Sequence, residues 1–205
     1  LHDVFTRHNE QEDSYSIYRP NLDPRYHQTT WCADRAIDFI SEMVHAPWLM
    51  SVNIFDPHGP FDVPAEYADR YDPDALPPPL FQEGDLQIQE RLKGFFFQGK
   101  PTRPGLRQQR NKASYYGSVE LIDYNVGRMM SALEATGQRE NTIVLFHSDH
   151  GEMLGDHGLT AKGCRFYEGA VRVPLIISWP GHLQQGLVAE GLVALTDLSP
   201  TLVEL

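Results

Sequence analysis

The stretch that decides the fold runs from Asn141 to Gly181 and reads NTIVLFHSDHGEMLGDHGLTAKGCRFYEGAVRVPLIISWPG. It opens with the apolar, β-branched run Thr142 to Phe146, which predicts a buried strand. A second apolar run, Val173 to Trp179, predicts another strand. Ligands of open α/β sheets bind beyond the carboxyl ends of the strands. We therefore expect the polar residues that follow Phe146 to lie at a functional edge.

Two further segments show helical periodicity. Apolar residues recur at helical spacing over Thr30 to His45 and over Asn111 to Thr136, which predicts two amphipathic helices. Between them, the run Trp48 to Phe55 predicts a strand that is buried on both faces. This alternation of helices and strands indicates an α/β fold with a parallel sheet covered by helices. The longer helix is expected to bury one stripe, made of Tyr116, Val119, Ile122, Val126, Met129 and Leu133.

The segment from Gly59 to Arg110 is the least regular part of the chain. Its triplet Pro77-Pro78-Pro79 is incompatible with a helix interior or a central strand. A short helix is expected around Asp85 to Phe97. The segment is either a lid that shapes the substrate site or a solvated surface loop. We find no interior linker, so residues 1–205 are interpreted as one domain with residues 59–110 as an irregular insertion.

Composition excludes some classes of protein. The 205 residues are 41% hydrophobic, which is typical of a folded globular domain. The net charge of −11 argues against nonspecific binding of nucleic acid. No apolar run approaches the roughly 20 residues of a membrane-spanning helix. Because the chain begins Leu1-His2-Asp3-Val4, without Met or a signal peptide, it is expected to be an excerpt of a longer protein.

Four polar residues are candidates for chemistry. Asp149 and His150 follow the first strand, and a carboxylate oxygen with an imidazole nitrogen suits a divalent cation. Lys162 carries a charge and three donors for a tetrahedral anion. His58 follows the earlier strand in Asp-Pro-His-Gly-Pro. The alternative is that these residues are a helix cap, a surface histidine, a solvated lysine and a turn histidine.

The motifs resemble those of the type I sulfatases, within the alkaline phosphatase superfamily. The matches occur in the family's order over most of the chain, so they count together. They are Asp56-Pro57-His58-Gly59-Pro60, Ser148-Asp149-His150-Gly151, Asp156-His157-Gly158-Leu159, Lys162-Gly163, Tyr167-Glu168-Gly169, Arg172-Val173-Pro174-Leu175, Trp179-Pro180-Gly181 and Leu195 to Thr201.

The resemblance implies an alkaline phosphatase-like three-layer sandwich with a mostly parallel sheet, present as a partial domain. It implies that Asp149 and His150 are metal ligands, with Ca²⁺ expected, or Mn²⁺ in a phosphonate monoester hydrolase. It also implies that Lys162 and His58 are catalytic, substrate-binding residues: Lys162 contacts the sulfate group, and His58 either contacts that group or protonates the leaving oxygen. His157 is expected at the mouth of the substrate pocket, with a structural role as the alternative.

The family nucleophile is a formylglycine made from Cys or Ser in a Cys-x-Pro-Ser-Arg motif. Cys32 lies in Trp-Cys-Ala-Asp-Arg, which lacks Pro and Ser and has Arg at the wrong spacing. Cys164 is followed directly by Arg-Phe-Tyr. Since neither cysteine fits, we expect these 205 residues not to hydrolyse sulfate esters by themselves.

Three functions remain open from the sequence. The first is a metal-dependent sulfuric ester hydrolase that acts on a small-molecule or carbohydrate sulfate ester. The second is a phosphonate monoester or phosphodiester hydrolase of the same superfamily, because both substrate classes present tetrahedral anions. The third is a noncatalytic relative or binding module that keeps the fold.

Overall fold

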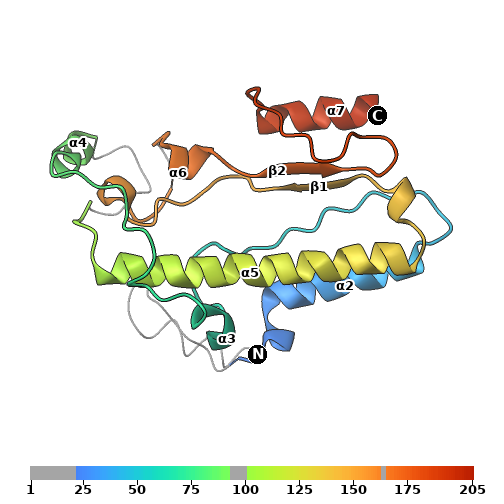
Figure 1. Ribbon diagram of the computed structural model, residues 1–205, viewed down its shortest axis with the longest axis horizontal. Helices are drawn as coiled ribbons and strands as arrows, with labels where there is room; N and C mark the ends of the chain where they lie inside the picture. The colour runs from blue at the N-terminus through green and yellow to red at the C-terminus, as the bar shows by residue number, and fades with distance from the viewer. Residues whose placement is uncertain (1–21, 93–100, 163–164) are drawn as a thin grey trace.

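The computed structural model describes residues 22–92, 101–162 and 165–205. The elements form three layers in Figure 1: helices α2 and α5 lie on one side of the strands β1 and β2, and helix α7 lies on the other. In chain order the elements are η1 (Pro24–Tyr26), α2 (Gln28–Glu42), α3 (Ala65–Ala68), α4 (Asp85–Arg91), α5 (Leu106–Ala135), η2 (Arg139–Asn141), β1 (Val144–His147), η3 (Asp156–Gly158), α6 (Glu168–Val171), β2 (Leu175–Ser178), η4 (Leu195–Asp197) and α7 (Leu198–Glu204).

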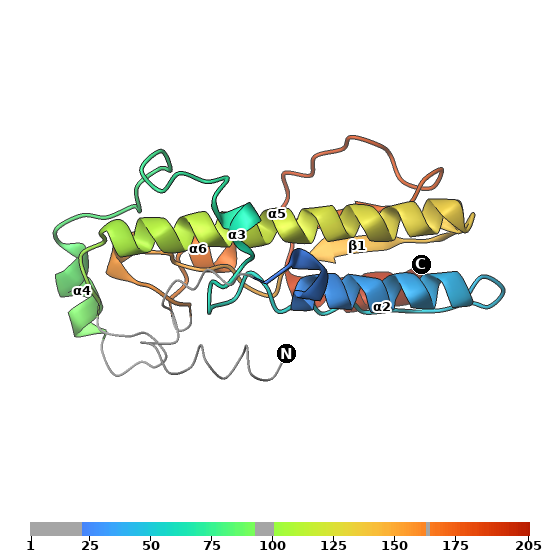
Figure 2. The same cartoon turned by 90° about the horizontal axis from the view of Figure 1, so that it is seen from below.

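The two long predicted helices are confirmed as α2 and α5, which lie side by side (Figures 1 and 2). Helix α2 buries Ala33, Ala36 and Ile40, residues spaced three and four apart on one face. Polar contacts also join the two helices. The Arg128 guanidinium of α5 lies 2.6 Å from the Asp34 carboxylate of α2, forming a partly buried ion pair.

The buried face of α5 differs from the predicted apolar stripe. Ile122 and Leu133 are buried as expected, but Tyr116 and Val119 are exposed. The helix instead turns small residues toward its neighbours, because α3 approaches it closely. A Cβ atom on Gly117 would lie 3.0 Å from the carbonyl carbon of Tyr67. Helix packing at this distance requires small side chains, which the apolar periodicity alone does not reveal.

The predicted strands at Thr142–Phe146 and Val173–Trp179 are confirmed as β1 and β2, but they pair antiparallel and not parallel. His147 at the end of β1 faces Leu175 at the start of β2. The connection therefore leaves and re-enters the sheet at the same end. A parallel pair needs a crossover that returns the chain to the opposite end, usually through a helix, and the described part of this connection contains only the short helices η3 and α6.

Residues 48–55 form no strand, although the segment is extended. Their exposure alternates residue by residue, from the half-buried Trp48 to the exposed Phe55, so one face is covered and the other is open. The segment returns along α2: the Trp48 ring packs edge-on against Phe39, and Cys32 Sγ lies 4.0 Å from the carbonyl oxygen of Asn53. The expected burial of both faces is thus wrong for the described residues.

The remaining described segments are short helices and loops. Within residues 59–110, the predicted short helix is confirmed as α4, and residues 93–97 of that prediction lie outside the described part. The C-terminal segment forms η4 and then α7. In the part of the chain that the structure describes, no helix has the length and hydropathy needed to cross a bilayer.

Candidate functional site

Asp149 and His150 lie in the turn that directly follows β1. The Asp149 carboxylate accepts a hydrogen bond from the His150 backbone N–H at 2.9 Å, and the Ser148 hydroxyl donates to the His150 carbonyl at 2.8 Å. His150 Nε2 lies 3.7 Å from Asp149 Oδ2. Metal–ligand bonds of about 2.0–2.6 Å place two ligands of one ion at about this separation. The local geometry therefore fits a shared cation.

The tautomer of His150 supports the same role. Its Nδ1 lies 2.9 Å from the carbonyl oxygen of Gly151. A carbonyl oxygen only accepts, so Nδ1 must carry the hydrogen and Nε2 of the neutral ring keeps its lone pair. Holding the second ring nitrogen in this way is how metal-binding histidines are commonly oriented. Nε2 is also the ring nitrogen that lies 3.7 Å from the Asp149 carboxylate.

Gly151 brings this turn against α6. Its N–H donates to the Ala170 carbonyl at 2.8 Å, and a Cβ atom at position 151 would lie only 2.1 Å from the carbonyl oxygen of Gly169. No side chain fits in that space. The backbone of the SDHG motif is thus in direct contact with the backbone of the YEG motif and the residue after it.

A small apolar cluster supports the same region. Met153, Leu159 and Ala170 are buried together, with Tyr167 packed against them. These residues come from the segments after Asp149, after η3 and within α6. The cluster holds the segments that carry the candidate residues in one unit.

Lys162 belongs to this unit. Its ammonium nitrogen lies 2.9 Å from Oε2 of Glu152, and the side chains are 17% and 3% exposed. Glu152 is two residues beyond His150, so the lysine reaches the segment that carries the metal-ligand candidates. Sequence reasoning found Lys162 but missed Glu152. The sequence did offer a signal for Glu152, because this acidic residue stands between the metal-ligand candidates and the apolar Met153. Met153 is the first residue of the buried cluster.

His58 lies on a separate segment, after residues 48–55. Its Nδ1 lies 2.6 Å from the Gly59 carbonyl oxygen, so Nδ1 carries a hydrogen and Nε2 is left to accept or, when protonated, to donate. The ring also packs on Phe55, with ring centroids 4.6 Å apart. Nε2 is therefore suited to the predicted contact with an anion or leaving oxygen. The meeting of His58 with Lys162 and Asp149 stays a prediction.

Asp56 anchors the segment that carries His58, and sequence reasoning missed it. Its carboxylate is buried and accepts a hydrogen bond from the Thr29 hydroxyl at the start of α2. Burial raises the pKa of Asp56 to about 6, while hydrogen bonds from Thr29 and Gln28 act in the opposite direction. A carboxylate that is this costly to bury fixes the first turn of α2 to the loop before His58.

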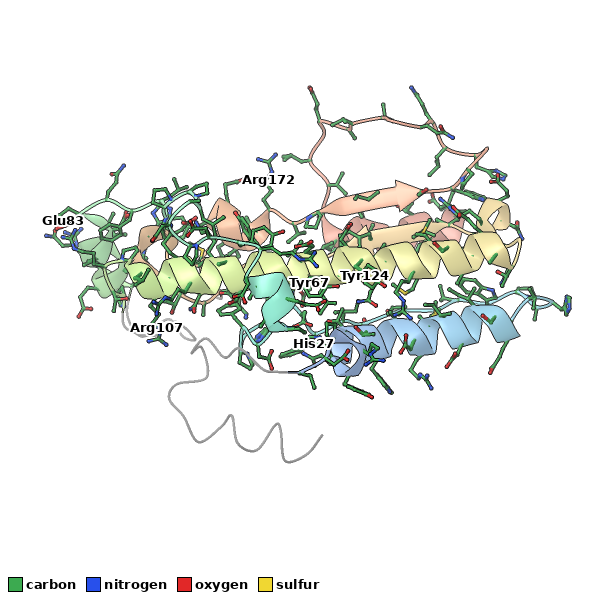
Figure 3. The ribbon with its side chains drawn as sticks, turned by 60° about the horizontal axis from the view of Figure 1, so that its bottom comes forward. His27, Tyr67, Glu83, Arg107, Tyr124 and Arg172 are labelled. Atoms are coloured by element: carbon green, nitrogen blue, oxygen red, sulfur yellow. The ribbon has the colours of Figure 1, made fainter. Side chains whose placement is uncertain are left out.

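A second group of possible metal ligands surrounds Asp56. One ligand atom each from His27, Asp56 and Asp62 lies within 4.8 Å of the others, and His27 stands at the start of α2 (Figure 3). Two carboxylates and an imidazole suit a divalent cation. However, His27 Nδ1 already accepts from the Thr29 N–H at 3.3 Å, and burial lowers the pKa of His27. Its Nδ1 lone pair is thus engaged in capping α2, so the group fits a metal less well than Asp149 and His150.

A family model described as Sulfatase matches residues 1–205. The chain belongs to the sulfatase family. It is 37% identical over 194 residues to an arylsulfatase from Clostridium perfringens, an alignment that covers 91% of this chain and 39% of the arylsulfatase. The sulfatase chain thus spans about two fifths of the length of that relative.

Solved structures agree with this assignment. The phosphonate monoester hydrolase of Agrobacterium radiobacter superposes with a TM-score of 0.72 at 26% identity, covering 87% of this chain and 41% of that one. A putative sulfatase, yidJ, from Bacteroides fragilis superposes with a TM-score of 0.68 at 30% identity, covering 86% and 36%. The prediction of an alkaline phosphatase-like fold, present as a partial domain, is confirmed.

His157 of this sulfatase chain is held by its neighbours. Its ring stacks on Tyr167 with centroids 4.1 Å apart, and its Nδ1 lies 3.4 Å from the Asp85 carboxylate at the start of α4. Its backbone N–H donates to the Leu80 carbonyl at 2.7 Å. These contacts favour the structural alternative, and its predicted contact with substrate stays untested.

Hydrogen bonds from the segments around His157 and Tyr167 join part of the 59–110 insertion to the candidate site. The Asp156 carboxylate accepts from the Leu80 N–H at 2.8 Å, and Gln89 of α4 donates to the Tyr167 hydroxyl at 2.8 Å. The Arg165 guanidinium also reaches Gln89, at 3.0 Å. The insertion therefore includes a part that is bonded to the motif segments, and not only a solvated loop.

Two further arginines form exposed ion pairs. Arg172 points outward in Figure 3. Its 3.9 Å ion pair with Glu168 is exposed, so the pair contributes little to the stability of the fold. Arg103 pairs with the exposed Glu83. Burial raises the pKa of the Cys32 thiol, which disfavours the reactive thiolate. Cys164 lies outside the described residues.

Proposed function

We propose that this chain forms the part of a metal-dependent sulfuric ester hydrolase that supplies two metal ligands and the contacts to the sulfate group. The observation that carries the proposal is the arrangement after β1. The paired Asp149 and His150 side chains, with Nε2 available, lie on a segment to which Lys162 is fixed through Glu152. The family match and the arylsulfatase relative support sulfate esters as the substrate class.

In this proposal Asp149 and His150 hold the divalent cation, with further ligands from outside these residues. A bound cation there stabilises negative charge on the oxygens of the reacting group. The family resemblance favours Ca²⁺, whereas an imidazole nitrogen suits Mn²⁺ better, because Ca²⁺ prefers oxygen ligands. By the family resemblance, the nucleophile is proposed to be a formylglycine; because no Cys-x-Pro-Ser-Arg sequence occurs among the 205 residues, it is proposed to come from outside them.

Lys162 and His58 are proposed to act on the substrate. The Lys162 ammonium has three donors, so its bond to Glu152 is compatible with a second bond to a sulfate oxygen. His58 presents Nε2, which can carry a proton to the leaving oxygen while Nδ1 stays bonded to Gly59. His157 is proposed to shape the pocket mouth through Tyr167. The substrate is proposed to be a small-molecule or carbohydrate sulfate ester.

A phosphonate monoester hydrolase is the second candidate, because the Agrobacterium enzyme of that class superposes over 87% of this chain. The test is a comparison of kcat/KM for an aryl sulfate and for a phosphonate monoester, using purified full-length protein. Preference for the sulfate supports the proposal, and preference for the phosphonate supports the second candidate. Turnover of neither substrate would favour a noncatalytic relative.

Variants connect that activity to the site. Lys162→Ala or Asp149→Ala in the full-length protein should reduce kcat/KM for the aryl sulfate by about 100-fold or more, since the first removes a positive charge beside the sulfate group and the second removes a ligand of the cation. Undiminished turnover in either variant would contradict the assigned role of that residue.

A further inference from the structure

Glu152 is a buried acid that the proposed chemistry does not use. Its side chain is only 3% exposed, and its Oε2 accepts from the Lys162 ammonium at 2.9 Å. Its other oxygen, Oε1, is buried and has no hydrogen-bond partner among the described residues. In the described structure the carboxylate is thus bonded to Lys162 through one of its two oxygens.

The charge of Glu152 also acts on a neighbouring ring. Burial and the negative charge of Glu152 together raise the pKa of Tyr115 to about 12. Tyr115 belongs to α5, and the Glu152 carboxylate is itself buried. In such surroundings a charge-assisted hydrogen bond is short and directional.

The backbone of Glu152 is held as firmly as its side chain. The preceding Gly151 is bonded to Ala170, and the following Met153 is 1% exposed within the apolar cluster. A lysine side chain without such a partner samples many rotamers, and ordering it costs conformational entropy. A fixed carboxylate orders the lysine before an anion arrives.

Stability is a weak explanation for this pair. Replacing a buried ion pair by apolar residues of similar volume is often neutral or stabilising. A negative charge beside the lysine also opposes the binding of an anion, unless the carboxylate contributes something else. Orientation of the ammonium group is a contribution that would account for its presence.

We propose that Glu152 is a positioning residue that directs the Lys162 ammonium toward the sulfate group of the substrate. This inference rests on the proposed function. Glu152 itself makes no contact with the substrate. Its effect depends on where its acceptor oxygen lies, and less on its charge.

Two conservative variants of the full-length protein separate position from charge. Glu152→Gln keeps an acceptor oxygen at the same distance but removes the charge, so kcat/KM for an aryl sulfate should stay within about fivefold of the wild type. Glu152→Asp keeps the charge but withdraws it by one methylene. It should lower kcat/KM by about 100-fold, as expected for a displacement on the order of 1 Å in a reacting group.

Inhibition by inorganic sulfate provides a readout that a structural role would not move. The inhibition constant should rise roughly tenfold in Glu152→Asp and change little in Glu152→Gln. The control is Leu121→Ala, which destabilises the α5 core without touching this unit. It should leave the inhibition constant unchanged at a temperature where the variant is folded.

The outcomes are distinguishable from failure of the proposed function. If the wild type turns over no sulfate ester, the proposed function itself is wrong. If the wild type is active but Glu152→Asp matches it in both kcat/KM and sulfate inhibition, the positioning role is overturned. A large loss in Glu152→Gln with little loss in Glu152→Asp would also overturn it, because charge and not position would then be decisive.

Discussion

Gly151→Ala is the substitution whose effect can be worked out most fully from the structure. The new Cβ atom would lie 2.1 Å from the Gly169 carbonyl oxygen, whereas real Cβ atoms essentially never approach other heavy atoms within 3.0 Å. The turn and α6 must therefore separate by at least 3.0 − 2.1 = 0.9 Å. The Gly169 oxygen belongs to the backbone and the position of a Cβ atom is fixed by its own backbone, so neither atom can rotate away.

That separation has two energetic consequences. The Gly151 N–H to Ala170 carbonyl bond would stretch from 2.8 Å to as much as 2.8 + 0.9 = 3.7 Å, beyond hydrogen-bonding range, at a net loss of about 0.5–1.5 kcal/mol. Overpacking against the buried cluster adds about 1–3 kcal/mol. We expect the free energy of unfolding to fall by about 1.5–4.5 kcal/mol. Displacement of Asp149 and His150 by about 1 Å should also lower kcat/KM roughly 100-fold.

The assay is urea denaturation of the full-length protein together with turnover of an aryl sulfate. The matched control is Gly127→Ala, because a Cβ atom at position 127 in α5 meets nothing within 4 Å. Alanine in a helix interior should stabilise that variant by about 0.5–1 kcal/mol and leave turnover unchanged. If Gly151→Ala is as stable and as active as Gly127→Ala, the close contact between the two motifs does not exist as described.

Two further predictions concern stability. The pKa of Asp56 is raised to about 6 in the folded state, so its contribution to stability is fully present below about pH 4 and is lost as the pH rises through 6. Relative to Asp56→Asn, the wild type should lose up to about 3 kcal/mol between pH 4 and 7, measured by denaturation at each pH; a pH-independent difference would contradict the burial of that charge. Leu121→Ala should lower the free energy of unfolding by about 2–5 kcal/mol, because Leu121 is fully buried in α5. A loss below 1 kcal/mol in the same measurement would show that this core is loosely packed.

Periodicity predicted the elements better than their arrangement. The positions of α2, α5, β1 and β2 followed from apolar spacing, with ends displaced by a few residues. The direction of β2 did not, because it depends on which end of β1 the chain returns to after Arg172. The buried face of α5 was also only partly predicted, since Gly117 and its close contact with α3 leave no apolar pattern.

The candidate site shows the same division. The motifs identified Asp149, His150, Lys162 and His58, which are residues whose chemistry is visible in their type. Asp56 and Glu152 were missed because their importance lies in burial and in the partner each one holds. An acidic residue in a sequence is most often solvated, and only the fold shows that these two are enclosed.

The most direct test of the metal assignment is the content of divalent metal per molecule of purified full-length protein, measured by inductively coupled plasma mass spectrometry. We predict one bound ion in the wild type, a strong reduction in Asp149→Asn, and no change in Asp62→Asn, since His27 Nδ1 in the second group is engaged by Thr29. Loss of the ion in Asp62→Asn together with its retention in Asp149→Asn would contradict the account.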